Sequence, residues 1–153
     1  VASRAMSLIG ESPTDQILEA MGDDDAEVRL HAVKALASYP AKAALEPVLN
    51  AIVTDSDINV KQAATVAAIE HIHKGYGRGL AKKLVNTVKK LENPDDRLRV
   101  IKLLRTDRIR NQIKVNKFEN LEYQIYEYME GKEQNEMVKR ELNFLLNYLD
   151  GTE

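Results

Sequence analysis

The chain has 153 residues, 44% of them hydrophobic, and a formal net charge of −2. This length suits one ordinary domain or about three to five helical repeats. Cysteine and tryptophan are absent, which excludes disulfides, thiol nucleophiles, cysteine-liganded zinc and iron–sulfur clusters. No apolar run approaches the ~18 residues of a membrane span, and the first residues lack the apolar core of a signal peptide. We therefore expect a soluble, cytoplasmic protein.

Helix signals begin at Ser12, an N-cap residue that is followed by Pro13 at the first helical position. Gly22 closes this helix, and the acidic run 23–25 caps a second helix, where negative charge also suits the helix dipole. Such a triplet could bind a cation, but helix capping explains it more simply. We predict two helices joined by a tight turn.

The second helix belongs to a sequence repeat. Residues 25–35 recur 32 residues later as residues 57–67, with the aspartate, a valine, the basic residue and both alanines in register. The segments before them align at the same offset, so each repeat contains two helices. The second helix carries an apolar stripe with small residues, which let neighbouring helices approach closely. We expect this stripe to be buried between repeats: Val28, Ala32, Ala35 and Leu36 in one copy, and Val60, Ala64, Ala67 and Ala68 in the next.

The repeat also bears on where the sequence starts. At an offset of 30, residues 2–6 align with residues 32–36, which places residue 1 within a second helix. We therefore expect the sequence to be a section of a longer protein.

Three glycines within residues 75–79 interrupt the pattern and break any helix. They form neither a dinucleotide-binding fingerprint nor a P-loop, because the glycine spacing differs and no Gly-Lys-Ser/Thr end follows. A third, weaker copy of the repeat comes after them at an offset of 38. Its second helix is expected to open with Asp95-Asp96-Arg97-Leu98-Arg99.

The motifs of these repeats are Leu8-Ile9-Gly10-Glu11-Ser12-Pro13, a first helix that ends Ile17-Leu18-Glu19-Ala20-Met21, and the patterns Asp-x-x-Val-Arg and Ala-x-x-Ala-Leu. Over roughly residues 1–105, these motifs resemble HEAT repeats, in particular the short bacterial kind seen in bilin-lyase-like proteins. The resemblance implies an all-α fold, an α-α superhelix (solenoid) of HEAT-like antiparallel helix pairs.

In that family, aspartate and arginine positions often form a polar ladder between successive repeats. The resemblance places three acidic and three basic residues in this ladder: Asp25, Asp57 and Asp95 with Arg29, Lys61 and Arg99. HEAT relatives also include lyases and glycosylases that act on alkylated DNA. No residues of such a pocket can be singled out in this sequence.

The last third of the chain has a different composition. All 16 alanines lie at or before Ala81, and six of the eight aromatic residues come after residue 117. We therefore predict HEAT-like repeats over residues 1–115 and a divergent helix pair over residues 116–150, which caps them. Two apolar stripes predict this pair: Phe118, Leu121, Ile125 and Met129, ending at Gly131, and Val138, Leu142, Leu145 and Leu149, ending at Asp150-Gly151.

The final helix carries a second stripe of large residues. Met137, Phe144 and Tyr148 lie about 100° from the first stripe, given the helical period. Either the helix is wedged deeply between its neighbours, or this stripe contacts a partner.

Charge is strongly segregated along the chain. Residues 1–73 hold 5 basic and 11 acidic side chains, residues 74–117 hold 14 and 4, and residues 118–153 hold 3 and 9. The central block is the best candidate for a binding site, because its excess of +10 coincides with the glycine insertion and the degenerate third repeat. The candidate binding residues are Arg78, Lys82, Lys83, Arg99, Lys102, Arg105 and Arg110.

Lys82 and Lys83 stand in the first turn of a helix, where they oppose the helix dipole unless an anion or a carboxylate lies nearby. The last four candidates are expected to share one side of the following helix. Two interpretations stay open. In one, the flanking acidic blocks neutralise the basic block within the chain; in the other, the basic side chains converge on one exposed surface and bind a partner.

We expect a binding protein with no catalytic activity, metal, cofactor or membrane contact: a HEAT-repeat scaffold or adaptor for an acidic protein or peptide. One alternative is a nucleic-acid or polyanion-binding solenoid, although Tyr76 is the one aromatic residue of the basic block that could stack on a base. Another alternative is a lyase-type enzyme subunit. His71 and His73 are two residues apart, so a helix points them about 200° apart and they cannot share a metal ion.

Overall fold

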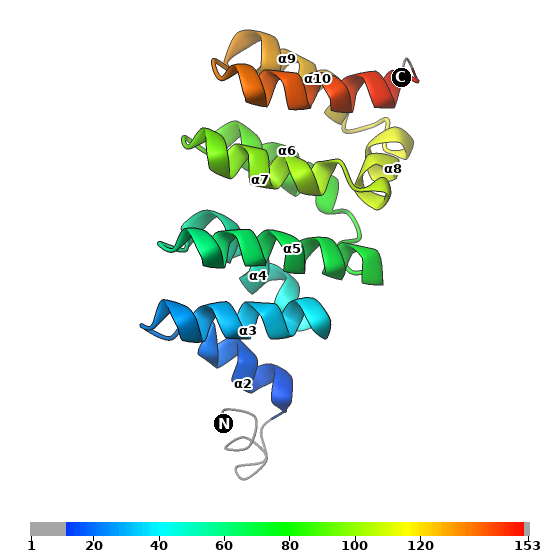
Figure 1. Cartoon of the computed structure of the whole chain (residues 1–153). Helices are drawn as coiled ribbons and strands as arrows, with labels where there is room; N and C mark the ends of the chain where they lie inside the picture. Colours follow the sequence, from blue (N-terminus) through cyan, green and yellow to red (C-terminus); the bar gives the residue numbers. More distant parts are fainter. Residues whose placement is uncertain (1–11, 152–153) are drawn as a thin grey trace. The chain divides into compact units, whose positions relative to one another are not determined.

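The computed structural model describes residues 12–151 and divides the chain into two compact units, Val1–Tyr76 (unit 1) and Gly77–Glu153 (unit 2). Within the described residues, the regular structure is helical throughout and contains no strand (Figure 1). The predicted all-α class is confirmed. The predicted boundary at residue 115 falls inside unit 2 and stays a prediction.

Unit 1 consists of two helix pairs joined by short loops. Helix α2 packs against α3, α4 packs against α5, and α3 lies along α5 (Figure 1). The elements are α2 (Pro13–Ala20), α3 (Ala26–Ser38), the 3-10 turn η1 (Lys42–Ala44), α4 (Leu45–Thr54) and α5 (Ile58–Lys74).

Side-chain caps set the first residue of three of these helices. The hydroxyl of Ser12 accepts a hydrogen bond from the Asp15 backbone N–H at 3.2 Å, and Pro13 follows at the first helical position. The carboxylates of Asp25 and Asp57 cap α3 and α5 in the same way. Each cap satisfies a backbone N–H that lacks a partner within the helix. The predicted helix starts are confirmed.

Small residues form the interface between α3 and α5. Ala64, Ala67 and Ala68 are completely buried, as are most of the other residues of the predicted stripe. Alanine at these positions lets the two helix axes come close together. The stripe is therefore core, apart from two positions on α3.

Val28 is 37% exposed and Ala35 is only half-buried, so the predicted burial of these two residues is wrong. The matching residue Val60 is buried because α5 packs along α3 of the repeat before it. For Val28, the preceding repeat falls among residues 1–11, outside the described residues.

A buried histidine fixes the loop after α3. The Nε2 atom of His71 accepts a hydrogen bond from the Ala41 backbone N–H at 3.1 Å, and its Nδ1 lies 2.6 Å from the carbonyl oxygen of Ala67. Since Nε2 accepts, Nδ1 carries the proton and donates to that carbonyl. His71 thus links the start of the second repeat to α5 and packs within the helix pair.

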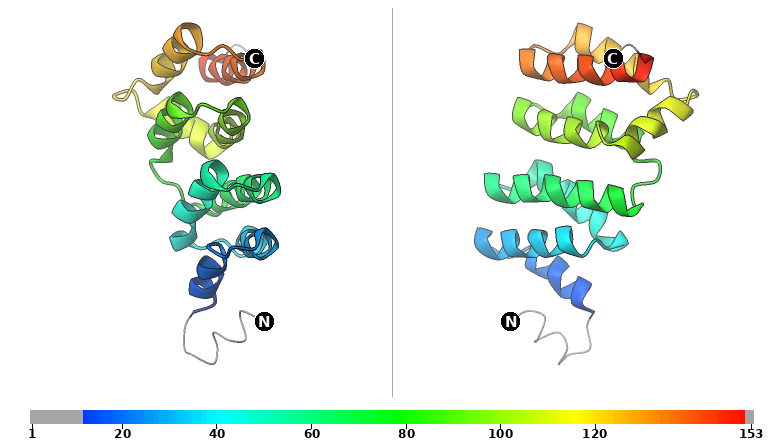
Figure 2. Two further views of the ribbon diagram at one scale, coloured as in Figure 1. Left: turned by 90° about the vertical axis from the view of Figure 1, so that its left-hand side faces the viewer. Right: turned by 45° about the vertical axis from the view of Figure 1, so that its right-hand side comes forward.

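Unit 2 contains two further helix pairs and one short helix beside them. Helices α6 and α7 form one pair and α9 and α10 the other, with α9 against α6 and α10 against α7 (Figure 2). The short helix α8 contacts α6, α7 and α10. The helices are α6 (Leu80–Lys90), α7 (Pro94–Leu104), α8 (Asp107–Val115), α9 (Leu121–Gly131) and α10 (Glu136–Asp150).

The glycine segment 75–79 breaks the helix, as predicted. Gly75 ends α5 with φ at 105°, and Gly79 precedes α6 with φ at 68°, both in the left-handed region that favours glycine. Within unit 2, the side chain of Gln112 on α8 stabilises the turn from Gly77 to the start of α6. It accepts from the Ala81 backbone N–H at 3.0 Å and donates to the carbonyl oxygen of Gly77 at 2.8 Å.

Two expectations for the helices of unit 2 are wrong. Arg105 and Arg110 do not share a helix, because the chain turns at Thr106 and α8 begins at Asp107. Phe118 is not part of α9; it is fully exposed in the preceding loop, and the helix begins after Asn120, which adopts a left-handed φ of 47°. The apolar spacing of Phe118 matches the helix, but the backbone at Asn120 prevents the helix from extending back to it.

The final helix follows the sequence pattern closely. Its four predicted core residues are buried, and Gly151 ends it in the left-handed conformation. These core residues are Val138, Leu142, Leu145 and Leu149. Within residues 12–151, no helix combines the length and the apolarity needed to cross a membrane.

Replacing Ala64 by glutamate tests the packing of α3 on α5. Ala64 is completely buried, so the new carboxylate would be enclosed without a counter-charge. We expect the free energy of unfolding to fall by about 3–5 kcal/mol, as for other unpaired buried charges. Urea denaturation followed by circular dichroism measures this loss. The exposed neighbour Gln62 provides the control, since Gln62→Glu should change stability by less than about 0.5 kcal/mol; equal effects would contradict the packing.

Candidate functional site

An arginine of one repeat binds a carboxylate of the next repeat in unit 1. The guanidinium of Arg29 on α3 donates from Nε and Nη2 to the two carboxylate oxygens of Asp55, at 3.0 and 3.1 Å. Its Nη1 donates to the backbone carbonyls of Asp23 and Asp24 at 2.9 and 3.1 Å. One side chain therefore joins the loop before its own helix to the loop before α5.

Unit 2 repeats this arrangement. Arg97 on α7 donates from Nη2 to the Glu133 carboxylate at 2.8 Å, and from Nη1 to the carbonyls of Leu91 and Glu92 at 3.0 and 2.8 Å. The hydroxyl of Tyr128 donates to the other Glu133 oxygen at 2.8 Å. Glu133 and Arg97 are both buried, so this network connects the two helix pairs of unit 2 within their core.

The two arginines occupy the same register position, four residues after the N-cap of their helix. Asn93 is the N-cap of α7, which places Arg97, and not Arg99, in the ladder. The predicted ladder places for Asp95 and Arg99 are therefore wrong by two residues; Arg99 pairs with Asp96 of its own helix at 2.7 Å. The sequence did contain the signal, since Asn93 precedes a proline, as Ser12 does.

Hydrogen bonds stabilise both acceptor carboxylates in their charged form. Burial alone would raise the pKa of Glu133, but bonds from the Asn135 backbone N–H, Arg97 and Tyr128 outweigh burial and lower it. Burial also raises the pKa of Asp55, but the bonds from Arg29 and the Asp57 backbone N–H, together with the attraction of Arg29 and Lys61, outweigh burial and lower it. Burial and the bond to Glu133 raise the pKa of Tyr128 to about 12.

The predicted binding residues on the α6 side of unit 2 are exposed and partly neutralised. Lys82 forms an ion pair with Glu119 at 2.9 Å, whereas Arg78 has no ion pair among residues 12–151. Lys83 is also exposed and has an electrostatic contact. Together with Lys90, the two lysines line an open groove of about 500 Å³ along α6.

The predicted binding residues on α7 and α8 form a second group. Arg105 pairs with Glu141 of α10, and Arg110 pairs with Asp107 of its own helix. Lys102 is exposed and has no ion pair within the described part of the chain. Glu119 and Glu141 belong to the acidic block beyond residue 118, so that block neutralises part of the basic one.

Several cations of this second group lie over aromatic rings of α10. The guanidinium carbon of Arg110 is 3.5 Å from the centre of the Tyr148 ring, and the Lys114 ammonium is 4.7 Å from the same centre. The guanidinium carbon of Arg105 is 6.0 Å from the centre of the Phe144 ring. Such contacts attract a cation to the negative face of the ring. Sequence reasoning missed Lys114, because its ring partner lies on another helix.

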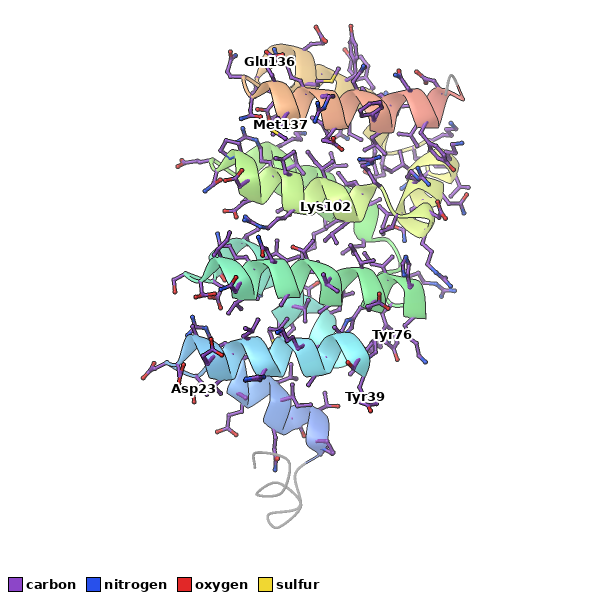
Figure 3. The ribbon with its side chains drawn as sticks, in the orientation of Figure 1. Asp23, Tyr39, Tyr76, Lys102, Glu136 and Met137 are labelled. Carbon is purple, nitrogen blue, oxygen red and sulfur yellow. The ribbon has the colours of Figure 1, made fainter. Side chains whose placement is uncertain are left out.

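The aromatic stripe of α10 is not wedged between neighbours. Met137 is 55% exposed and Phe144 is 47% exposed, while Tyr148 is half-buried beneath its two cations. Figure 3 labels Met137 near the start of α10 and Lys102 on α7. We call this surface the basic–aromatic face; it comprises Lys102, Arg105, Arg110, Lys114, Met137, Phe144 and Tyr148.

Among the described residues, no group of three or more histidine, aspartate or glutamate side chains could hold a metal ion. His71 is buried in its helix pair, and His73 is exposed. The arrangement offers charged and aromatic contacts for a partner.

Comparison with known proteins agrees with the repeat pattern. Residues 2–70 match the family model described as HEAT repeats. Neither the comparison with curated proteins nor the comparison with solved structures yields a match.

Replacing Glu133 by glutamine tests the buried network of unit 2. The substitution keeps the side-chain size but leaves the charge of Arg97 without its counter-ion. We expect the free energy of unfolding to fall by about 3–5 kcal/mol at neutral pH, because a buried pair loses one partner. Thermal or urea denaturation measures the change. The exposed Glu127 on α9 is the matched control, and Glu127→Gln should have almost no effect.

The same variant should change the dependence of stability on pH. The pKa of Glu133 is lower in the folded state than its ordinary value of 4.5, so its stabilising effect is complete above that value. The effect is lost as the pH falls through the folded-state pKa. We expect Glu133→Gln to lose less stability on acidification than the unsubstituted protein. Parallel curves would contradict the assigned ion pair.

Proposed function

We propose that this chain, whose residues 2–70 belong to the HEAT repeat family, is a scaffold that binds an acidic segment of a partner protein through the basic–aromatic face of unit 2. HEAT repeats are generally protein-interaction scaffolds. Stacked helix pairs present an extended surface that gains affinity from many modest contacts. The proposal includes no catalytic step, metal or cofactor.

The contact of Arg110 and Lys114 with one ring carries the proposal. A guanidinium that lies over an aromatic face can still donate to a carboxylate at its edge, as Arg110 does to Asp107, whose side chain is exposed. Tyr148 thus holds two cations in place at one site, which lowers the entropy lost when a carboxylate binds. A chance scatter of surface lysines would not share a ring.

Exposed apolar side chains on the same face indicate what accompanies the acidic residues. Met137 and Phe144 are large and half-exposed, and Phe144 lies beside Arg105. Methionine and aromatic residues are enriched in protein interfaces, where they supply most of the buried area. A segment with acidic residues beside leucine or phenylalanine would match both features.

The internal ion pair of Arg105 does not block this use. The side chains of Arg105 and Glu141 are 45% and 22% exposed, so water and salt already screen their attraction. Surface pairs of this kind contribute about 0–1 kcal/mol. A partner carboxylate can therefore replace Glu141 at a small free-energy cost.

The groove along α6 supports a second candidate function, binding of a polyanion such as nucleic acid. Lys82, Lys83 and Lys90 line this groove, and clustered lysines gain affinity for phosphates by releasing counterions. Binding of that kind falls steeply with salt concentration. The two functions use different helices, so substitutions can separate them.

The test uses the full chain and a fluorescent peptide in which glutamates alternate with leucine and phenylalanine. We expect Lys102→Glu combined with Phe144→Ala to weaken peptide binding at least about tenfold, equivalent to about 1.4 kcal/mol. Both side chains are exposed, so helicity should be unchanged. Lys132→Glu, an exposed charge reversal in the loop after α9, is the control and should bind normally.

A fluorescent oligonucleotide is the second probe in this experiment. Unchanged peptide binding in the double variant would contradict the proposed face. Strong oligonucleotide binding that is lost in Lys83→Glu with Lys90→Glu would instead support the polyanion function of α6.

A further inference from the structure

A second groove lies on the final helix pair, and none of its lining residues belongs to the basic–aromatic face. It has a volume of about 480 Å³ and lies between one side of α9 and one side of α10. On α10, its lining residues follow the helical spacing i, i+3, i+4, i+7. We call it the terminal groove; it is lined by Glu122, Tyr123, Tyr126, Asn143, Leu146 and Asp150, among others.

Equivalent positions on the other helices indicate which type of structural element this groove can bind. Leu36 on α3 and Leu104 on α7 stand eleven residues after their N-caps and are buried. Leu104 lies beside Ile125 and Leu142 of the following helix pair. Leu146 occupies the same position on α10; it is also buried, and it lines the floor of the terminal groove beneath the exposed tyrosines. This side of the helix receives another helix elsewhere in the stack.

The polar residues of the groove make it unlike the sides that pack inside the stack. Three residues before Leu146, α10 carries the exposed Asn143, where α3 and α7 carry the buried Val33 and Ile101. A tightly packed HEAT helix would leave that amide without water. The groove therefore suits a helix with polar as well as apolar contacts.

Aromatic and acidic side chains together define its chemistry. Tyr123 and Tyr126 are 55% and 52% exposed, and tyrosine contributes apolar area and a hydroxyl at an interface. All charged residues of the lining are acidic: Glu122, Glu130 and Asp150. A hydrogen bond between the side chains of Glu122 and Asp150, together with burial and the charge of Asp150, raises the pKa of Glu122. The attraction of Lys117 and Lys114 opposes this only in part. Two adjacent carboxyl groups repel when both are charged, and a cation between them would relieve this.

We propose that the terminal groove binds an amphipathic helix of a partner protein that carries arginine or lysine beside its apolar stripe. The apolar stripe packs on Tyr123, Tyr126 and Leu146, and the basic residues pair with Glu122 and Asp150. This inference goes beyond the proposed function, because it concerns a different surface and a partner of opposite charge. The protein would thereby join an acidic segment and a basic helix.

Within residues 12–151, the basic helices of a second copy do not fit that description. The basic helices α6 and α7 bury their apolar stripes in the core of unit 2, so neither can offer one to a neighbour without unfolding. The occupant must come from a helix whose apolar stripe is exposed in its free state.

The experiment compares two synthetic helical peptides of about 18 residues with the same leucine stripe. One carries lysine and arginine beside the stripe, and the other carries glutamate at the same positions. Fluorescence anisotropy with the full chain measures both affinities. We expect the basic peptide to bind at least tenfold more tightly than the acidic one. We also expect Tyr126→Ala and Asp150→Lys each to weaken its binding at least tenfold.

Two controls keep the result specific to the groove. Glu127→Lys makes the same charge change on an exposed position of α9 that does not line the groove, and should alter binding less than threefold. Asp150 is the last residue of α10, where lysine suits the helix dipole, so Asp150→Lys should fold normally. Lys102→Glu should leave basic-peptide binding intact, which separates this test from that of the proposed function.

Three outcomes would overturn the inference. Equal affinity for the two peptides would remove the charge argument. Equal weakening by Glu127→Lys and Asp150→Lys would show general electrostatic attraction without a site. A dimer in sedimentation analysis that Tyr126→Ala dissociates would assign the groove to a second copy of the chain.

Discussion

The arginine that links one repeat to the next is the interaction on which both units depend. In each unit it occupies the fourth position after an N-cap, binds two carbonyl oxygens of its own loop and reaches a carboxylate of the following repeat. Taking these charges out of water is costly, so the pairs depend on the further hydrogen bonds that each arginine donates to backbone carbonyls. These directional hydrogen bonds fix the register between repeats. Apolar packing alone is not directional and would allow neighbouring helices to slide.

Two features determine how the helices of unit 1 pack: the small residues of α5 and the ion pair of Arg29 with Asp55. The alanines of α5 set how closely the helices approach, and Arg29 with Asp55 sets their relative position at the loop end. In unit 2 the buried residues are mostly leucine, isoleucine and valine, and Tyr128 donates to the carboxylate of the pair. The same register therefore holds with different core volumes, because the polar contact is made at the ends of the helices.

The two exposed surfaces of unit 2, the basic–aromatic face and the terminal groove, carry opposite charge. One side of α10 meets the cations of α7 and α8, and another side forms a groove with acidic residues of α9. Segregated charge along the sequence is thus converted into two separate surfaces of unit 2.

The sequence by itself determined the local structure. The helix starts at Ser12, Asp25 and Asp57 and the helix break at the glycines follow from side chains and dihedral angles within a few residues. Only the tertiary structure decided which carboxylates meet which cations, since Arg29 and Asp55 are 26 residues apart and Arg97 and Glu133 are 36 apart. Contacts at such separations depend on how helices stack, and an insertion of a few residues between repeats shifts them without changing any local signal. This is why the buried side of α5 could be predicted from the repeat, whereas the carboxylate partners Asp55 and Glu133 and the ring beneath Arg110 could not.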